Sequence, residues 1–303
     1  MSGNARAAGV AVTDPQLLGV APAEPPEQPS APPHLGVVLT APKPAPKGWP
    51  AGQVEPVWRW LSTRRAPIAV LVAGVEGGVG TSTTAALVAE TIAAGSCGPT
   101  VLLDQCGSPW ASVSRRVFGE RAGLDGAQVA QAMRSGITPL RLLATAPTSS
   151  AGAAVVADPA VRTPLRELGR LVAVSNGSLV VDAGRVDLLL TARLELHPVV
   201  VAVGRTDVAG AEALCAALAW LRGRGVTPVV VLDTTMPGEQ RRRTAARTLL
   251  STAGADAVAI PHDPRLAHGG ELRLDRLATA TASALLQLLG RLSSACPGGR
   301  HDR

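Results

Sequence analysis

Apolar residues along the chain gather in short runs that contain few polar positions. The six clearest runs are residues 68–73, 99–104, 178–182, 198–203, 227–232 and 257–260. Such an uninterrupted run indicates a strand that is buried on both faces, as in a parallel sheet. Segments with helical spacing alternate with these runs, among them Val208 to Arg222, Gly238 to Thr252 and Leu272 to Leu292. The alternation predicts an α/β fold with a doubly wound, mostly parallel sheet and helices on both faces.

The pattern is weaker between residues 111 and 171. Here we expect short helices at residues 111–118, 124–135 and 161–171, and a strand at residues 140–146. In an open sheet of this kind, ligands bind in the crevice at the carboxyl ends of the strands. We therefore expect ligand-binding residues where each apolar run ends.

The first 50 residues have a different composition, with stretches such as APAEPPEQPSAPP and APKPAPKGWP. They bury too little apolar area to offset the entropy of ordering, so we expect a disordered, locally polyproline-like tail. We divide the chain into a tail at 1–65, a domain at 66–293 and a flexible C-terminus at 294–303. Trp58 and Trp60 either pack on the edge of the domain or form an anchor for a partner, since tryptophan is common at binding hot spots.

A glycine-rich turn, E-G-G-V-G-T-S-T from Glu76 to Thr83, follows the first apolar run and precedes a helical segment. A strand, a glycine loop and a helix in this order let backbone N–H groups wrap a phosphate at the helix N-terminus. The loop resembles the deviant Walker A motif of the ParA/MinD family, K-G-G-x-G-K-[ST]-T, and the domain is therefore expected to be P-loop NTPase-like. Both lysines of that motif are replaced, by Glu76 and Thr81. A loop that only joins strand to helix remains an alternative.

The resemblance implies a set of site residues. Nucleotide contacts would come from the loop and from the I-P-x-D-like segment at 260–263, namely Gly77, Gly78, Val79, Gly80, Thr81, Ser82, Thr83, Pro261 and Asp263. A magnesium ion would be held by Ser82, Asp104 and Asp182, the two aspartates each ending an apolar run. The implied cofactor is ATP or ADP with Mg²⁺, bound weakly.

The sequence departs from the family pattern at further positions. Cys106 stands where the family has a second acid, and Asp233 falls where many relatives carry an asparagine that contacts the base. The only lysines of the chain are Lys43 and Lys47 in the tail, and Arg185 is the one cation close in sequence to Asp182. We therefore expect an inactive or very weak ATPase.

The charge does not by itself indicate a nucleic-acid partner. The net charge is +6, with six basic and four acidic residues in 1–65 and 23 against 19 in the remainder. The densest basic cluster, Arg241, Arg242 and Arg243, is either a solvated helix face or a nonspecific contact to DNA phosphates. The chain has no run of 18 apolar residues and no signal sequence, which predicts a cytoplasmic protein without direct membrane insertion.

We expect a degenerate ParA/MinD-like protein that serves as a non-catalytic positioning or partner-binding component, in partition, conjugation, localisation or secretion. The alternatives are an active ATP-dependent switch that cycles between monomer and dimer, and a nonspecific DNA-binding structural protein. A protein partner would bind through the N-terminal tail, and a homodimer is compatible with the resemblance.

Overall fold

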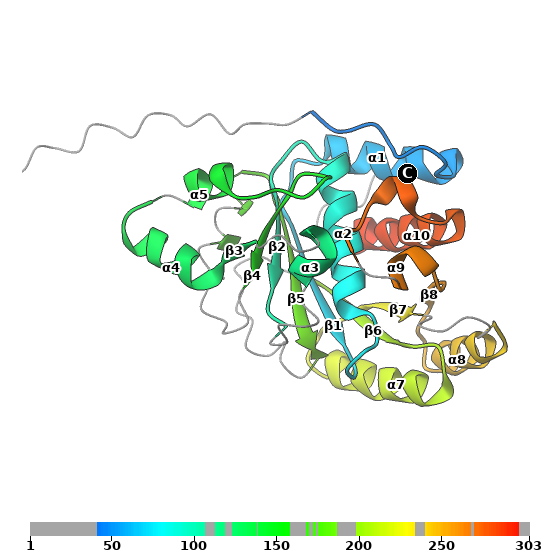
Figure 1. Cartoon of the computed structure of the whole chain (residues 1–303). Coiled ribbons are helices and arrows are strands. Elements are labelled where there is room, and N and C mark those ends of the chain that lie inside the picture. Colours follow the sequence, from blue (N-terminus) through cyan, green and yellow to red (C-terminus); the bar gives the residue numbers. More distant parts are fainter. Residues whose placement is uncertain are drawn as a thin grey trace, which may run out of the picture. The chain divides into compact units, whose positions relative to one another are not determined.

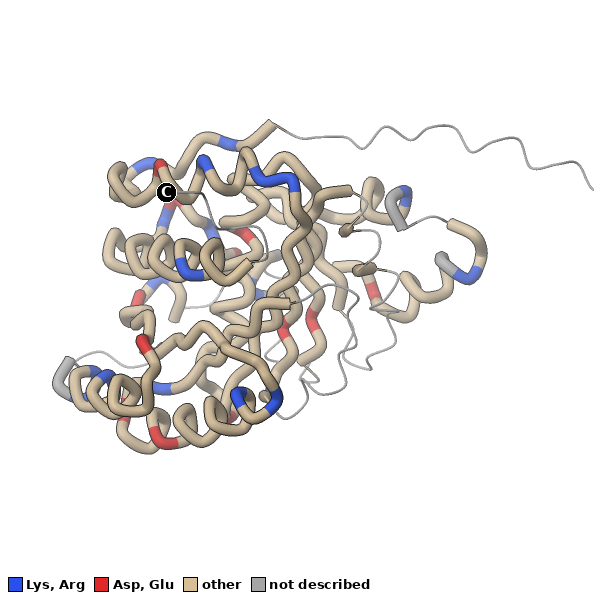
Figure 2. The backbone as a smooth tube through the Cα atoms, turned by 180° about the vertical axis from the view of Figure 1, so that it is seen from behind, with Lys and Arg blue, Asp and Glu red and all other residues tan. Residues whose placement is uncertain are grey.

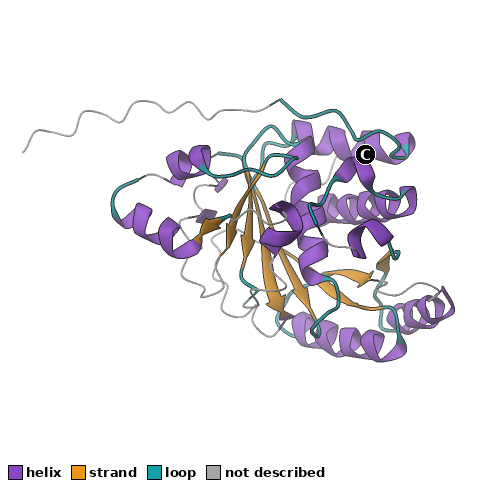
Figure 3. Ribbon diagram, in the orientation of Figure 1, coloured by secondary structure: helices purple, strands orange, loops and turns teal. Residues whose placement is uncertain are grey.

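The computed structural model describes residues 41–106, 113–118, 123–137, 139–157, 168–169, 172–173, 175–186, 198–233, 240–267 and 270–296. The expected disordered tail up to residue 40 lies outside these ranges. So do residues 297–303, expected to be flexible, and most of the helix expected at 161–171. Figures 1 and 3 show a sheet between layers of helices. The strands are β1 Ile68–Gly74, β2 Thr100–Asp104, β3 Leu124–Asp125, β4 Ala153–Ala157, β5 Ser178–Arg185, β6 Val199–Arg205, β7 Val229–Asp233 and β8 Ala257–Ile260.

These eight strands form one sheet in the order β3-β4-β2-β5-β1-β6-β7-β8, and every neighbouring pair is parallel. β1 lies between β5 and β6, so the glycine loop that follows it stands at the centre of the carboxyl edge. The predicted doubly wound, parallel α/β fold is confirmed.

Helices cover both faces of the sheet. They are α1 Ala51–Thr63, α2 Thr81–Gly95, α3 Val113–Phe118, α4 Gly126–Arg134, α5 Pro139–Thr145, α7 Val208–Arg222, α8 Gln240–Thr252, α9 Pro264–Ala267, the 3₁₀ turn η3 Leu274–Arg276 and α10 Thr279–Ala295. Alternate residues of β1 belong to two different cores on opposite faces of the sheet. Val70 and Val72 pack with α1, α2 and α10 on one face, and Leu71 and Ala73 pack with α4, α5 and α7 on the other.

Two elements in the middle of the chain differ from expectation. The prediction of a strand at 140–146 is wrong, because Pro139–Thr145 forms helix α5. The strand in this part of the chain is β4 at Ala153–Ala157. Short apolar runs such as L-R-L-L-A fit either a helix or a strand, and the five small residues of β4 carry little periodicity. The helix expected from residue 124 begins at Gly126, since Leu124–Asp125 pairs with β4.

Residues 41–63 pack on the domain, on the N-terminal side of the boundary expected at residue 66. Helix α1 buries Val57 and Leu61 in the core with α2 and α10. Ahead of it, residues 41–50 form a segment that we call the N-terminal strap. Its Trp49 is 8% exposed and donates from Nε1 to the carbonyl of Leu274 at 3.0 Å.

Trp58 on α1 completes the attachment of the strap. It donates from Nε1 to the carbonyl of Lys43 at 3.0 Å and meets Trp49 edge to face, with ring centroids 5.7 Å apart. The interpretation of the tryptophans as packing residues is supported by these contacts. No helix in the described part of the chain combines the length and the hydropathy needed to cross a bilayer.

Candidate functional site: the glycine loop and its charges

The glycine loop between β1 and α2 has the backbone that a phosphate cradle requires. Gly78 and Gly80 have φ angles of +75° and +82°, which only glycine adopts without strain. Gly80 is the N-cap of α2, and no side chain caps the N–H groups of the first turn. Around Gly77 and Gly78 a Cβ would meet nothing within 4 Å. The crest of the loop is therefore open and lined by backbone amides.

Thr81, at the position of the second missing lysine, folds under the loop. A Cβ on Gly74, the last residue of β1, would lie 2.3 Å from Thr81 Oγ1 and 2.7 Å from the buried side chain of Val79. The Thr81 hydroxyl is therefore held against the end of β1. A short neutral side chain in this place supplies no charge to a ligand on the crest.

A carboxylate lies against the start of α2. A Cβ on Gly80 would lie 1.6 Å from Oδ2 of Asp233, the last residue of β7. The N-terminus of a helix attracts negative charge, and here part of that attraction is already directed at an acidic side chain of the same chain. A phosphate at this end of the loop would meet Asp233 as well as the amides.

The loop also carries an internal ion pair. Oε1 of Glu76 lies 3.2 Å from Nε of Arg205, which ends β6, and NH2 of Arg205 lies 3.1 Å from Oδ2 of Asp207. The side chains of Arg205 and Glu76 are 39% and 37% exposed, so the pair contributes on the order of 1 kcal/mol or less to stability. Its main effect is that the nearest cation to Glu76 is shared between two carboxylates.

The three predicted metal ligands converge one strand away. β2 and β5 are neighbours, and their register places Asp104 directly beside Asp182. Burial raises the pKa of Asp182 to about 6; the Ser82 hydroxyl and the Gly184 N–H lower it, and the charge of Asp104 raises it. The sequence-predicted Ser82, Asp104 and Asp182 therefore form one corner beside the loop.

The oxygens of this corner fit a hard divalent cation. Oδ1 of Asp182 accepts from the Gly184 N–H at 3.2 Å, but Oδ2 is buried and has no aligned donor among the described residues. Asp104 is held by the N–H groups of Cys106 at 3.1 Å and Ser114 at 3.4 Å. Mg²⁺ prefers carboxylate and hydroxyl oxygens, which Asp182 and Ser82 would supply, with Asp104 behind them. The described residues contain no group of three or more His, Cys, Asp or Glu able to hold a metal.

The I-P-x-D-like segment at 260–263, expected to lie beside the nucleotide base, also has a structural function. Asp263 is 3% exposed, and its carboxylate accepts from the N–H groups of Arg265 at 3.0 Å and Ala278 at 2.9 Å. It thereby fastens the start of α9 to the start of α10. Whether the backbone at Pro261 and Asp263 contacts a base stays a prediction.

The basic candidates named from the sequence lie on β5 and α8. Arg185 ends β5 in register with Gly74, and its side chain is exposed. Arg241, Arg242 and Arg243 lie in the first turn of α8 beyond β7, and Arg242 is exposed. Lysines and arginines are spread over the helices and connecting segments (Figure 2). The sequence analysis did not predict Arg205 as a site residue. A basic residue at the end of β6, the strand next to β1, could have indicated a charge close to the glycine loop.

Known structures with this arrangement were found by comparison. The ParA family ATPase from Chlorobium tepidum TLS matches with a TM-score of 0.56 and 17% identity, over 74% of this chain and 99% of that chain. The fold is that of the ParA/MinD ATPases. A chain of the Aquifex aeolicus MinC:MinD cell division protein complex matches with a TM-score of 0.56 and 15% identity, over 78% of this chain and 98% of that chain. The Pyrococcus furiosus cell division ATPase MinD matches with a TM-score of 0.52 and 12% identity, over 75% of this chain and 99% of that chain. No protein-family model and no curated protein matches the chain.

Proposed function

We propose that this chain is a degenerate ParA/MinD-like protein that acts as a non-catalytic positioning or partner-binding component. The observation that carries the proposal is the pairing of Glu76 with Arg205 on the loop where the ParA/MinD motif has a lysine. The fold and the open glycine crest are retained, whereas the charge at the loop is reversed and internally matched.

The charges around the loop oppose a triphosphate. A bound polyphosphate would approach Glu76 on one side and Asp233 on the other, while Arg205 is already engaged by two carboxylates. Losing a charge-assisted contact costs about 1.5–3 kcal/mol, or roughly ten- to a hundred-and-fifty-fold in affinity. With two lysines replaced, we expect affinity for ATP or ADP no better than high micromolar.

The retained corner of Ser82, Asp104 and Asp182 favours the alternative of a working nucleotide switch. If a nucleotide binds, this corner would hold its Mg²⁺, which supplies positive charge that the loop lacks. Binding should therefore depend on the metal. The loop residues from Gly77 to Thr83 would contribute backbone amides and hydroxyls.

For partners we propose a protein rather than a membrane. Aquifex aeolicus MinD occurs in a complex with MinC, and the composition of the proline-rich N-terminal tail of this chain suits a docking segment. Contact of Arg241, Arg242 and Arg243 with DNA phosphates would be a secondary activity, and a homodimer is compatible with the fold. We place the protein in the cytoplasm.

The test is phosphate release and sedimentation with ATP and Mg²⁺. We expect no turnover above background and no ATP-driven dimer. The double variant Glu76→Gln/Asp233→Asn removes both carboxylates from the loop and should bind Mg·ATP at least about tenfold more tightly. Glu55→Gln, an exposed change on α1, is the matched control and should have no effect. Family-like turnover by the unchanged protein would refute the proposal.

A further inference from the structure

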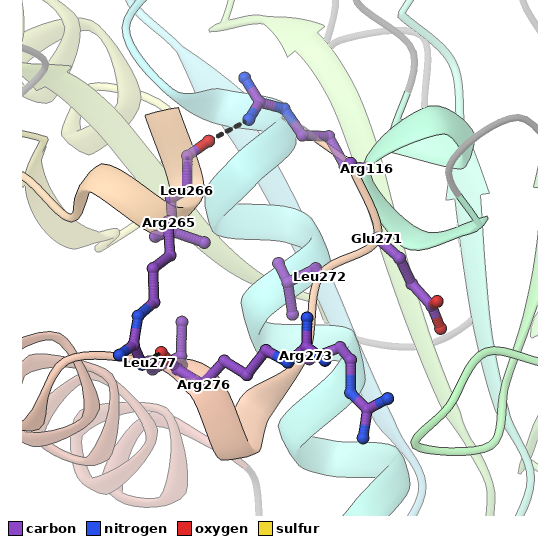
Figure 4. A pocket seen from close by; sticks show the side chains of 9 residues that line it. Arg116, Arg265, Leu266, Glu271, Leu272, Arg273, Arg276 and Leu277 are labelled. Carbon is purple, nitrogen blue, oxygen red and sulfur yellow. Dashed lines mark hydrogen bonds between the residues drawn. The ribbon is translucent and has the colours of Figure 1, made fainter. Parts of the chain in front are cut away.

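A pocket whose lining includes no residue of the glycine loop lies in front of helix α2 (Figure 4). Its walls come from α3, α9, residues 270–273, η3 and Leu277, and its volume is about 450 Å³. This volume lies within the range of small-molecule sites, roughly 300–1,000 Å³. Nothing in the proposed nucleotide chemistry uses these walls.

The polar part of the lining is strongly basic. Four arginines line the pocket, Arg116, Arg265, Arg273 and Arg276, against a single acidic residue, Glu271. In Figure 4, Arg265 lies on one side of the pocket, with Arg116 and Glu271 on the other. Guanidinium groups bind phosphate in a bidentate manner and stay charged at any physiological pH. Among the lining residues the surplus is three positive charges, and it is two when Asp275, which pairs with Arg273, is counted. Such a surplus around one cavity favours an anionic ligand.

The walls are fastened to one another before any ligand binds. Arg116 donates to the carbonyl of Leu266 at 2.7 Å, and its own carbonyl accepts from the Leu272 N–H at 2.7 Å. The Arg265 guanidinium donates to the carbonyl of Arg276. Pre-formed walls reduce the entropy lost on binding, so the site is organised for a ligand.

Arg276 is the arginine best placed to serve a ligand. Arg116 and Arg265 are used by backbone carbonyls, and Arg273 pairs with Asp275 at 3.2 and 3.3 Å. The side chain of Arg276 is exposed and makes no hydrogen bond or ion pair among the described residues. Substituting it therefore removes charge without breaking a wall.

The remaining lining is apolar. Leu266, Leu272 and Leu277 line the same pocket, and Leu272 is 5% exposed. A ligand that fits would pair phosphate groups with the arginines and place a less polar body on the leucines. We propose that this pocket binds a small phosphate-bearing molecule, as a site separate from the glycine loop.

The pocket is also joined to the N-terminal strap. The carbonyl of Leu274, the first residue of η3, accepts from Trp49 Nε1 at 3.0 Å. Any shift of η3 on ligand binding would change the surroundings of this indole. Tryptophan fluorescence therefore gives a second readout of occupancy.

The experiment is a titration of the full chain with inorganic pyrophosphate at constant ionic strength and without Mg²⁺. Binding is measured by calorimetry and by tryptophan fluorescence. We expect saturable binding that falls about ten- to a hundredfold in Arg276→Gln. Arg59→Gln, an exposed arginine on α1, is the charge-matched control and should bind like the unchanged chain. Ser82→Ala, a change at the other site, should also leave binding intact.

Three results would overturn the proposal. One is no saturable binding of pyrophosphate by the unchanged chain. The second is equal affinity in Arg276→Gln, and the third is an affinity lost in Ser82→Ala, which would place the anion at the glycine loop. Failure of nucleotide binding at the loop leaves this pocket untouched, so the two proposals fail separately.

Discussion

Glu90 is a carboxyl group buried in the middle of helix α2, and its substitution makes a quantitative prediction. Burial raises its pKa from 4.5 to about 7, although the Ser149 hydroxyl, the Ala151 N–H and the charge of Lys43 favour the ionised form. Glu271 raises the pKa further. The Ala151 N–H donates to Oε2 at 3.2 Å, while Oε1 has no aligned donor among the described residues.

The sign of the pH dependence follows from the raised pKa. Below pH 4.5 the side chain is protonated in both the folded and unfolded states, and its contribution to stability is complete. As the pH rises towards about 7, the unfolded chain loses its proton first, and the folded state becomes less stable. The difference between 4.5 and about 7 corresponds to roughly 3 kcal/mol. Glu90→Gln is neutral at every pH, and we expect it to stabilise the protein by about 1–3 kcal/mol at pH 8, since the amide must also find partners.

The assay is urea unfolding of the unchanged protein and Glu90→Gln at pH 5, 6, 7 and 8. The gain in stability should be smallest at pH 5, where ionisation of the unfolded side chain accounts for about 1 kcal/mol or less, and should reach its full value at pH 8. Asp182, whose pKa is also raised, is present in both proteins and cancels in the difference. Glu55→Gln, an exposed carboxyl on α1, should give a flat difference. A Glu90→Gln protein that is no more stable than its parent at pH 8 would refute the reasoning.

Further predictions concern the packing of the N-terminal segment and the half-buried Arg64. Arg64 donates to Ser96, Ser178 and three backbone carbonyls, so Arg64→Met should cost about 3 kcal/mol in urea unfolding, and Arg64→Lys should recover only part of it. Trp49→Phe keeps an aromatic ring but loses the hydrogen bond to Leu274, and should cost about 1 kcal/mol. Deleting residues 1–40 should leave the melting temperature within a few degrees, whereas deleting 1–50 should lower it clearly.

The sequence predicts the regular part of the fold well. β8 at Ala257–Ile260 and α7 at Val208–Arg222 have the bounds that their apolar patterns indicate, because each is buried or flanked by strong turn residues. β4 at Ala153–Ala157 is missed because small residues carry a weak pattern, and its burial is decided by neighbouring strands. The packing of the strap depends on contacts between Trp49 and Leu274, which are 225 residues apart.

The candidate site could be predicted only in part for a similar reason. Local motifs locate the glycine loop and the aspartates that end apolar runs, Asp104 at the end of β2 and Asp182 within β5. They do not tell which charges face each other across the carboxyl edge of the sheet. Arg205 reaches Glu76 from β6, and Asp233 reaches Gly80 from β7, by register rather than by spacing in the sequence.

The central claim is that the glycine loop keeps the backbone of a phosphate cradle but has charges that oppose a nucleotide. The most direct measurement is calorimetric titration of the full chain with ATP in the presence and absence of Mg²⁺. We predict a dissociation constant no tighter than high micromolar with Mg²⁺, and no measurable binding without it. Submicromolar binding by the unchanged protein would contradict this claim.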